Sequence, residues 1–379
     1  MKEINFNEPL HLNNSIRNVH KFLNQKKPLH GPGENILRIK EELKKKFNFK
    51  NVYLTNSCTS ALEICALNLN LKKNDEIILP SFSFVTTASS FVRTGCKLKY
   101  CDIEKSTLMP SFQQIKKCVN KNTKVIIILH YQGFSVDYLD NLQNYCKKKK
   151  IYLIEDAAQG FGSFFKDKPL GSFGDFSCFS FHETKNISSG AGGMLVVNNK
   201  KFIRKSNFIF DKGTNRYLMN KKKIKYYSWV EIGSAFLMSE FVASYLMPQI
   251  TNYKKIFLKR SKNYLRYVYN FKNWLSNDFY LVNNYNYKYK YNFHAFVIIL
   301  KNNERGRFLK YLKKNKIHAV ISYTPLHKSK AGKKYKLKKD NLHFTDNLIN
   351  KVVRLPLHNY LTFREIDYIC FKIKQYFKK

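Results

Sequence analysis

Three segments of this chain place chemically active side chains next to an apolar run. The first is IYLIEDAAQG, in which Asp156 follows a strand-like run and Gln159 comes three residues later. A buried carboxylate at such a place suits a site that keeps a ring nitrogen protonated, and Gln159 would reach a hydroxyl group on the same ring. The alternative is that Glu155 and Asp156 cap a following helix. This segment alone leaves both interpretations open.

The second segment, FSCFSFHETKNISSGAGG, runs from a strand into a polar, glycine-rich loop that contains a single lysine, Lys185. A lysine held there partly away from water can form a Schiff base with a carbonyl compound and then move protons. Ser180 stands at the strand end, and Gly190, Gly192 and Gly193 allow a close approach of the backbone to a ligand. The alternative is an ordinary solvated loop lysine, of which this chain has many.

The third segment, TNSCTSALEICALNL, places Thr59 and Ser60 at the expected start of a helix. Free backbone N–H groups and the helix dipole favour a phosphate at such a start. The alternative is a plain helix cap in which Glu63 completes a capping box. The segment matches neither a Walker loop nor the GxGxxG pattern, so no motif supports a nucleoside triphosphate or a dinucleotide.

A lysine, a carboxylate for a ring nitrogen and a phosphate site are the parts that one cofactor, pyridoxal 5'-phosphate (PLP), requires. Ligands of open α/β sheets bind at the carboxyl ends of the strands, so the three segments are expected to meet there. Phe84, in PSFSFVTTASSF, follows another strand end and would either face the cofactor ring or belong to the core. The combination predicts a PLP enzyme with Lys185 as its reactive amine.

The elements that position these residues alternate between strands and helices from residue 51 to 199, as in a mostly parallel sheet covered on both faces. The expected strands are Glu76–Leu79, Lys97–Ile103, Lys124–His130, Ile151–Glu155, Phe176–Phe181 and Met194–Val197. The expected helices are Thr59–Asn68, Phe84–Arg93, Ser111–Val119 and Val136–Lys148. The predicted fold is α/β, with a large PLP-binding domain and its N-terminal arm over residues 1–248.

Beyond Pro248 the chain becomes rich in Lys and Tyr. A long helical stretch leads through Asn283–Asn292 to a strand-like run, His294–Leu300. We expect a smaller α+β C-terminal domain over residues 249–379, in which the lysine-rich segment Lys328–Lys339 is a solvated loop.

The composition, 44% hydrophobic and 15% aromatic, is that of a globular protein. A net charge of +42 raises the alternative of a nucleic-acid or membrane-surface partner, but the lysines are spread along the whole chain, and we expect neither nucleic-acid binding nor membrane insertion. Eight cysteines show no CxxC pair or matching His spacing, which predicts no metal site and reduced thiols. The N-terminal residues do not form a signal peptide, so we expect a cytoplasmic protein.

Over nearly its full length the chain resembles the DegT/DnrJ/EryC1/StrS sugar aminotransferases. The matching blocks are TNSCTSALE, LPSFSFVTTASSFV, LHYQGFSVD, EDAAQGFGSFFKDKPLGSFGDFSCFSFHETKN, KGTNR, IGSAFLMSE and YTPLH. SFHETKN together with KGTNR and IGSAFLMS is most similar to the dTDP-4-amino-4,6-dideoxygalactose transaminase branch. The resemblance implies the PLP-dependent transferase fold of type I, which is aspartate aminotransferase-like, and a homodimer with shared active sites.

The resemblance also implies a role for each candidate residue. Lys185 would bind PLP covalently, Asp156 would pair with the pyridinium nitrogen, Gln159 would contact the ring hydroxyl group and Phe84 would stack on the ring. The phosphate would be held by Thr59, Ser60 and Ser180, and the sugar nucleotide would lie near Arg216, Tyr323 and His327. Many members lend an Asn from the partner subunit within an Asn-Tyr-Arg run, where this chain has Ala235, Phe236 and Leu237, so the resemblance does not extend to this contact.

The implied reaction has two halves. L-Glutamate converts PLP to pyridoxamine 5'-phosphate (PMP) and leaves as 2-oxoglutarate. The amino group then passes to the 4-keto carbon of dTDP-4-dehydro-6-deoxy-D-glucose, giving dTDP-4-amino-4,6-dideoxy-D-galactose for surface polysaccharides such as common antigen or O-antigen. Family members that dehydrate sugars have His in place of Lys185, so this lysine implies transamination. The alternatives are a transaminase that acts at C3 or on a UDP-keto sugar, and a basic nucleic-acid-binding protein that keeps only the fold.

Overall fold

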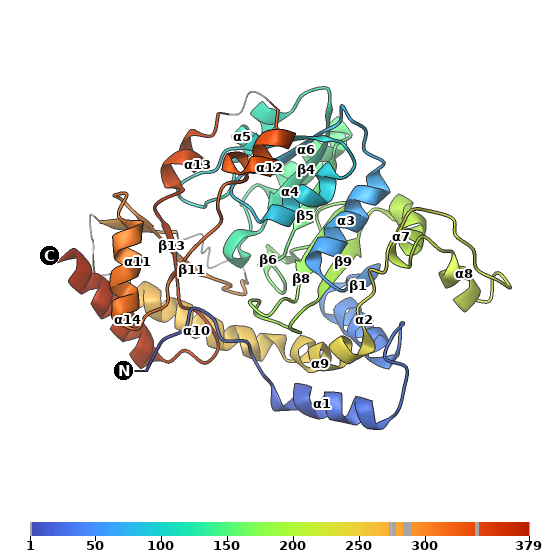
Figure 1. The fold of residues 1–379 in the computed structure, drawn as a ribbon, viewed down its shortest axis with the longest axis horizontal. Helices are drawn as coiled ribbons and strands as arrows, with labels where there is room; N and C mark the ends of the chain where they lie inside the picture. Colours follow the sequence, from blue (N-terminus) through green and yellow to red (C-terminus); the bar gives the residue numbers. More distant parts are fainter. Residues whose placement is uncertain (1, 273, 275–277, 283–289, 338–340, 379) are drawn as a thin grey trace.

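A seven-stranded sheet organises the first half of the chain (Figure 1). The computed structural model describes residues 2–272, 274, 278–282, 290–337 and 341–378. The strand order is β1-β9-β8-β5-β4-β2-β3; pairing is parallel from β8 to β3 and antiparallel at β8/β9 and β9/β1. The strands are β1 Val52–Thr55, β2 Glu76–Pro80, β3 Lys97–Cys101, β4 Thr123–Leu129, β5 Tyr152–Asp156, β8 Phe176–Ser180 and β9 Gly193–Val197. The expected mostly parallel α/β sheet is confirmed.

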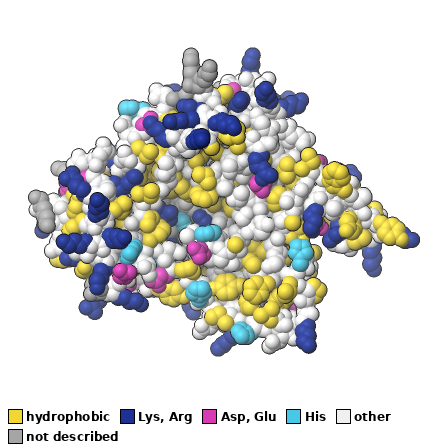
Figure 2. Space-filling model, in the orientation of Figure 1, with side chains coloured by type: hydrophobic (Ala, Val, Ile, Leu, Met, Phe, Trp, Pro, Cys, Tyr) yellow, Lys and Arg dark blue, Asp and Glu magenta, His cyan; other side chains and the backbone are white. Residues whose placement is uncertain are grey.

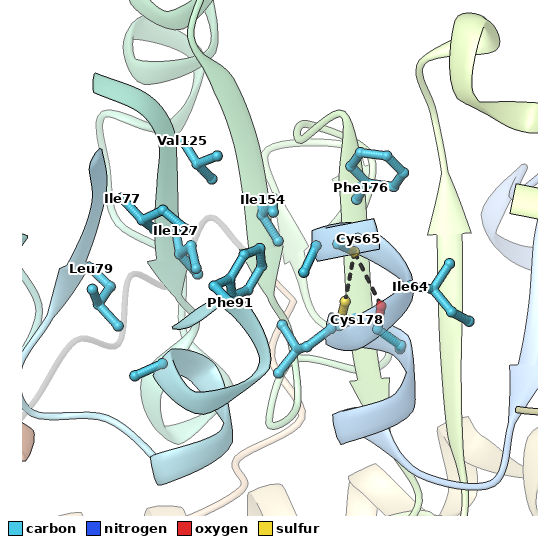
Figure 3. Packing of buried hydrophobic residues seen from close by; sticks show 14 of the residues in the cluster. Ile64, Cys65, Ile77, Leu79, Phe91, Val125, Ile127, Ile154, Phe176 and Cys178 are labelled. Carbon is cyan, nitrogen blue, oxygen red and sulfur yellow. Dashed lines mark hydrogen bonds between the residues drawn. The ribbon is translucent and has the colours of Figure 1, made fainter. Parts of the chain in front are cut away.

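Both faces of this sheet are covered, which explains its uninterrupted apolar strands. In β4, Val125 and Ile127 pack on one face, whereas Ile126 and Ile128 pack on the other. The first face carries α3 Cys58–Leu69, α4 Val85–Val92 and α7 Ile203–Phe210, and Figure 3 shows its side chains. The opposite face carries α5 Phe112–Cys118 and α6 Leu139–Lys149, and towards β1 it carries α2 Glu34–Phe47 and α9 Glu240–Thr251.

The carboxyl ends of β5, β8 and β1 meet at one edge of the sheet. Asp156 lies in register with Cys178, and Gly193 pairs with Ser180 on one side and Thr55 on the other. A Cβ atom on Gly193 would lie 2.3 Å from the carbonyl carbon of Ser57. Only glycine therefore lets the start of α3 approach the end of β8 this closely.

A four-stranded sheet, in the order β10-β11-β13-β12, organises the C-terminal part of the chain. All its pairings are antiparallel, and the strands are β10 Phe279–Leu281, β11 Phe296–Leu300, β12 Val320–Ile321 and β13 Val352–Leu355. The helices α10 Tyr253–Lys272, α11 Arg305–Lys314 and α14 Phe363–Phe377 pack on one face of it (Figure 1). Residue 248, the predicted domain boundary, falls inside α9, and the division into two domains stays a prediction.

The remaining elements lie at the periphery or connect the two sheets. They are α1 Asn13–Asn24, α8 Arg216–Asn220, α12 Lys330–Tyr335, α13 His343–Leu348, the hairpin of β6 Phe164–Phe165 with β7 Lys168–Pro169, and the 3-10 turns Tyr131–Gly133, Lys200–Phe202 and Leu326–Lys328. Over the described ranges, no helix is both long enough and apolar enough to cross a membrane.

Two local expectations were wrong. The segment Lys328–Lys339 contains a helix, α12, because the Ser329 side chain accepts a hydrogen bond from the Gly332 N–H and so caps it; residues 338–340 lie outside the described ones. The capping box with Glu63 does not form, because Ser57 caps α3 and Glu63 instead pairs with Arg93. Of the expected stretch Asn283–Asn292, residues 283–289 likewise lie outside the described residues.

Candidate active site

Asp156 ends β5 and is buried. The Thr87 hydroxyl donates to its Oδ2 (2.6 Å), and the Ala158 N–H donates to its Oδ1 (3.2 Å). The turn after β5 is not a helix, so the helix-cap interpretation of Asp156 is wrong. Burial raises the pKa of this carboxyl group, although both hydrogen bonds and the Lys185 charge oppose the rise. Such a carboxylate gains stability when a cation binds beside it.

Lys185 is not an ordinary solvated lysine. It is only partly exposed and lines a small cavity together with Gln159, Ser180, Asn186 and His294. Burial, followed by the nearby positive charge of Arg354, lowers the pKa of the Lys185 amine from 10.5 to about 8. Asp156 acts in the opposite direction, which places the two candidate catalytic groups within electrostatic reach of each other. A lysine with this pKa supplies a neutral, nucleophilic amine near neutral pH.

The start of α3 lies beside these two residues. Burial raises the pKa of the Cys58 thiol, as does the charge of Asp156, whereas that of Lys185 lowers it. Thr59 and Ser60 follow in the first turn, and the Ser60 side chain donates to Asn56 Oδ1 (2.5 Å). Ser180 ends the neighbouring strand β8 across Gly193. Hydroxyl groups and a helix start thus adjoin the cavity, as a phosphate site requires.

Gln159, which lines the Lys185 cavity, is held in place by two hydrogen bonds. Gln159 accepts from the Gln132 N–H (2.7 Å), and its amide donates to the Tyr323 hydroxyl oxygen (2.6 Å). The Tyr323 ring lies 6.4 Å from the Phe84 ring. Phe84 is 54% exposed and is therefore not a core residue. Phe84 therefore presents part of its side chain to solvent beside Tyr323.

The other two predicted sugar-nucleotide residues differ in their placement. His327 lies just beyond the carboxyl end of β2, where its Nδ1 contacts the Ser81 hydroxyl group (2.6 Å) and its Nε2 contacts Asp346 (3.0 Å). Arg216 lies away from the other candidate residues. It lies on α8, which projects from the body of the protein, and its contacts are with Asp211 and the Tyr227 ring (Figure 1).

Sequence reasoning missed several residues that complete the site. Thr87 lies inside the expected helix after Phe84, and only its bond to Asp156 reveals its importance. Asn186 donates to the Asn292 carbonyl oxygen (2.7 Å), and His294 contacts the Asn186 amide oxygen (3.0 Å). These bonds tie the Lys185 loop to the irregular segment that leads into β11. The signal available in the sequence was the polar pair Asn292 and His294 inside an apolar run.

The residues present fit PLP. The fit rests on a buried carboxylate that a cationic ring nitrogen would stabilise, a partly neutral lysine in the same cavity, and a helix start beside a strand-end serine. Each of these supplies one recognition element of the cofactor.

Comparison with known proteins agrees with this geometry. A model of the DegT/DnrJ/EryC1/StrS aminotransferase family matches residues 11–374. The protein MJ1066 of Methanocaldococcus jannaschii is 25% identical over 338 residues, which are 87% of this chain and 86% of that protein. GDP-perosamine synthase of Vibrio cholerae is 34% identical over 173 residues (46% of this chain, 47% of that enzyme). The dTDP-4-dehydro-2,3,6-trideoxy-D-glucose 4-aminotransferase of Saccharopolyspora spinosa is 33% identical over 148 residues (39% and 38%). The alignments with these two enzymes span less than half of either chain.

Solved structures share the whole fold. PseC of Helicobacter pylori, an aminotransferase involved in the biosynthesis of pseudoaminic acid, has a TM-score of 0.90 at 25% identity and covers 100% of both chains. Spr1654 of Streptococcus pneumoniae, solved in a PLP form and a PMP form, has a TM-score of 0.88 at 22% identity and covers 99% of both chains. A family match that leaves out only the chain ends settles the assignment: the chain belongs to the DegT/DnrJ/EryC1/StrS aminotransferase family and is a PLP-dependent sugar aminotransferase.

Proposed function

We propose that this enzyme moves the amino group of L-glutamate to the 4-keto carbon of dTDP-4-dehydro-6-deoxy-D-glucose. The products would be 2-oxoglutarate and dTDP-4-amino-4,6-dideoxy-D-galactose, an aminosugar nucleotide for surface polysaccharide synthesis in the cytoplasm.

The observation that carries the proposal is the placement of the Lys185 amine in one cavity with Gln159 and Ser180, within electrostatic reach of Asp156. When bound, PLP supplies an electrophilic carbonyl group and an electron-accepting ring. Lys185, as a neutral amine, would take a proton from the carbon that loses the amino group and return one to the carbon that gains it. Asp156 would keep the ring nitrogen protonated, and the hydroxyl groups at the start of α3 would fix the phosphate.

The choice of sugar rests on similarity. The blocks around Lys185 and KGTNR are most similar to the dTDP-4-amino-4,6-dideoxygalactose branch. The Saccharopolyspora spinosa relative is named as a 4-aminotransferase of a dTDP sugar. Both favour C4 and dTDP over the alternatives at C3 or on a UDP sugar.

Turnover of a panel of keto sugar nucleotides tests the proposal. The panel holds 4-keto and 3-keto sugars on dTDP, UDP and GDP, with L-glutamate as donor and 2-oxoglutarate release as the readout. We expect the highest kcat/KM for dTDP-4-dehydro-6-deoxy-D-glucose, with a Lys185→Ala variant as the blank. A higher value for a 3-keto sugar, or for a UDP or GDP sugar, would overturn the substrate assignment and leave the aminotransferase assignment in place.

A further inference from the structure

Arg354 extends from the four-stranded sheet towards the site. It lies on β13 in register with Val297 of β11. Because side chains alternate along a strand, Arg354 shares its face with Val352, two residues earlier. Val352 and Val297 pack in the cluster that includes β4 and α6, whereas Val353 and Leu355 pack against α10 and α14. The guanidinium group therefore points towards the seven-stranded sheet.

The hydrogen bonds around His294 fix the state of its ring. The Asn186 amide nitrogen donates to the Asn292 carbonyl oxygen, so the Asn186 amide oxygen faces His294 Nδ1, which must carry the hydrogen. Burial holds the pKa of His294 well below its ordinary value, and so do the neighbouring cations Lys185, Arg354 and Arg260. The ring is neutral, and its Nε2 is left as an acceptor that faces Arg354 Nη2 at 3.4 Å.

Among the described residues, Arg354 has no acidic partner. Its guanidinium carbon lies 4.9 Å from the centre of the Phe6 ring, in the N-terminal arm, and its Nε is buried without a hydrogen-bond partner. Within the described part of the chain, no carboxylate oxygen lies within 4.0 Å of an Arg354 nitrogen. A partly buried cation without a counter-charge is costly, and a bound anion would offset that cost.

The charge of Arg354 acts on the candidate active site. It lowers the pKa of the Lys185 amine and opposes the rise that burial causes in the pKa of the Tyr323 and Tyr131 hydroxyl groups. His294, which Arg354 Nη2 faces at 3.4 Å, lines the same cavity as Lys185, so an anion bound by Arg354 would lie close to the carbon on which Lys185 acts. In an amino-acid donor the α-carboxylate is one bond from that carbon, whereas the diphosphate of a sugar nucleotide is separated from its keto carbon by most of the sugar ring.

We propose that Arg354 binds the α-carboxylate of the amino-acid donor, with His294 and Phe6 holding the guanidinium group in position. Arginine suits this task because its planar fork donates two parallel hydrogen bonds to a carboxylate. The inference rests on the proposed aminotransferase function and adds the recognition of the donor.

The test compares two probes on the PLP-loaded enzyme. α-Methyl-L-glutamate binds as a donor but has no hydrogen on its α-carbon to lose, so its binding is read at equilibrium from the cofactor absorbance. 4-Amino-4-methylpentanoate is the same molecule with a methyl group in place of the α-carboxylate, and its amine-bearing carbon likewise has no hydrogen to lose. We expect the wild type to favour the first probe on the order of 10²-fold and Arg354→Gln to bring this ratio close to one. Arg354→Lys should keep only part of the preference, because lysine retains the positive charge but cannot donate two parallel hydrogen bonds to the carboxylate.

Arg266→Gln is the matched control, because Arg266 pairs with Asp367 on α14 and should leave the ratio unchanged. A ratio that Arg354→Gln does not alter overturns the inference. So does a loss confined to the second half-reaction, in which the PMP form is mixed with the keto sugar nucleotide, because that result assigns Arg354 to the sugar nucleotide. If neither probe changes the absorbance of the wild type, the proposed function itself fails, so the two failures are distinguishable.

Discussion

The surroundings of Lys185 lead to a prediction about pH. Burial and the charge of Arg354 lower the pKa of its amine to about 8, and only the neutral amine attacks a carbonyl group. The rate at which the cofactor-free enzyme captures PLP should therefore rise with pH and level off above about 8, not above the ordinary 10.5. Stopped-flow absorbance measures this rate, and an N-acetyl-lysine amide control corrects for titration of PLP itself. Arg354→Gln should move the midpoint to higher pH; a wild-type rate that still climbs at pH 10 would contradict the assignment.

Asp156 should control turnover more than cofactor binding. In an Asp156→Asn variant the side chain keeps its shape and still accepts a hydrogen bond from Thr87, but it no longer carries the charge that holds a ring nitrogen protonated. We expect PLP to bind while kcat falls by about 10² or more, the scale of a lost proton-transfer aid. PLP content is measured by absorbance and turnover by 2-oxoglutarate release. Near-normal turnover would show that Asp156 has only a structural role.

The residues of the site were predictable where they belong to one sheet edge. Lys185, Asp156 and Ser180 could be found because each lies at or just after the end of an apolar strand, and such strand ends meet. Arg354 could not be found, because it lies on a strand of another sheet far along the chain, and His294 lies in the segment that leads into β11 of that sheet. No local pattern tells which strand of one sheet will face a given loop of another.

The turn between β7 and β8 depends on a buried carboxylate of β5. Glu155 accepts from His130 Nε2 and from the backbone N–H groups of Gly171, Phe173 and Gly174. Burial alone would raise the pKa of Glu155, but these hydrogen bonds and the charge on His130 lower it, so the charged form stabilises the fold at neutral pH. Its contribution should be lost as the pH falls through the carboxyl range.

Glu155→Gln should therefore destabilise the fold while preserving side-chain shape. We expect a loss of about 3 kcal/mol in the free energy of unfolding, because a buried, hydrogen-bonded charge is removed and its donors keep only part of their partners. Urea denaturation followed by circular dichroism measures this change. Glu63→Gln is the control: Glu63 pairs with the largely exposed Arg93, and its loss should cost less than about 1 kcal/mol. Equal effects for both variants would refute the role of Glu155.

At the level of elements, the sequence predicted those strands and helices whose apolar residues form a clear pattern along the chain. The continuous apolar run of β4 and the amphipathic run of α6 were both recognised, because burial on two faces or on one leaves a pattern. β1 was missed because its four residues, Val52–Thr55, are too few to show a period. α12 was missed because its stability comes from the Ser329 cap, and a run of lysines conceals that signal.

At the scale of the whole molecule, one segment projects from the body of the protein (Figure 1). Isolated antiparallel bridges join Asp211 to Ala235 and Thr214 to Trp229, so the segment between them, which includes α8, extends outward as an arm. The arm exposes Tyr226 (74%), Trp229 (79%) and Ile232 (66%), and Figure 2 shows hydrophobic side chains at its tip. Lysines and arginines are scattered over most of the face that Figure 2 shows. We propose a protein partner for this exposed apolar arm, and the family resemblance makes a second copy of this chain the expected one.

A homodimer with shared sites, which we propose from the family resemblance, would explain why Arg216 lies on this arm, far from the other candidate residues. The prediction is that Arg216 of one subunit completes the site that contains Lys185 of the other. Lys185→Ala and Arg216→Ala should each be inactive as pure dimers. In a refolded equimolar mixture, half of the dimers are mixed and each carries one site with both wild-type residues, so roughly a quarter of the wild-type activity should return. Sedimentation should show dimers throughout. If each chain used its own Arg216, every mixed site would lack one of the two residues and the mixture would stay inactive.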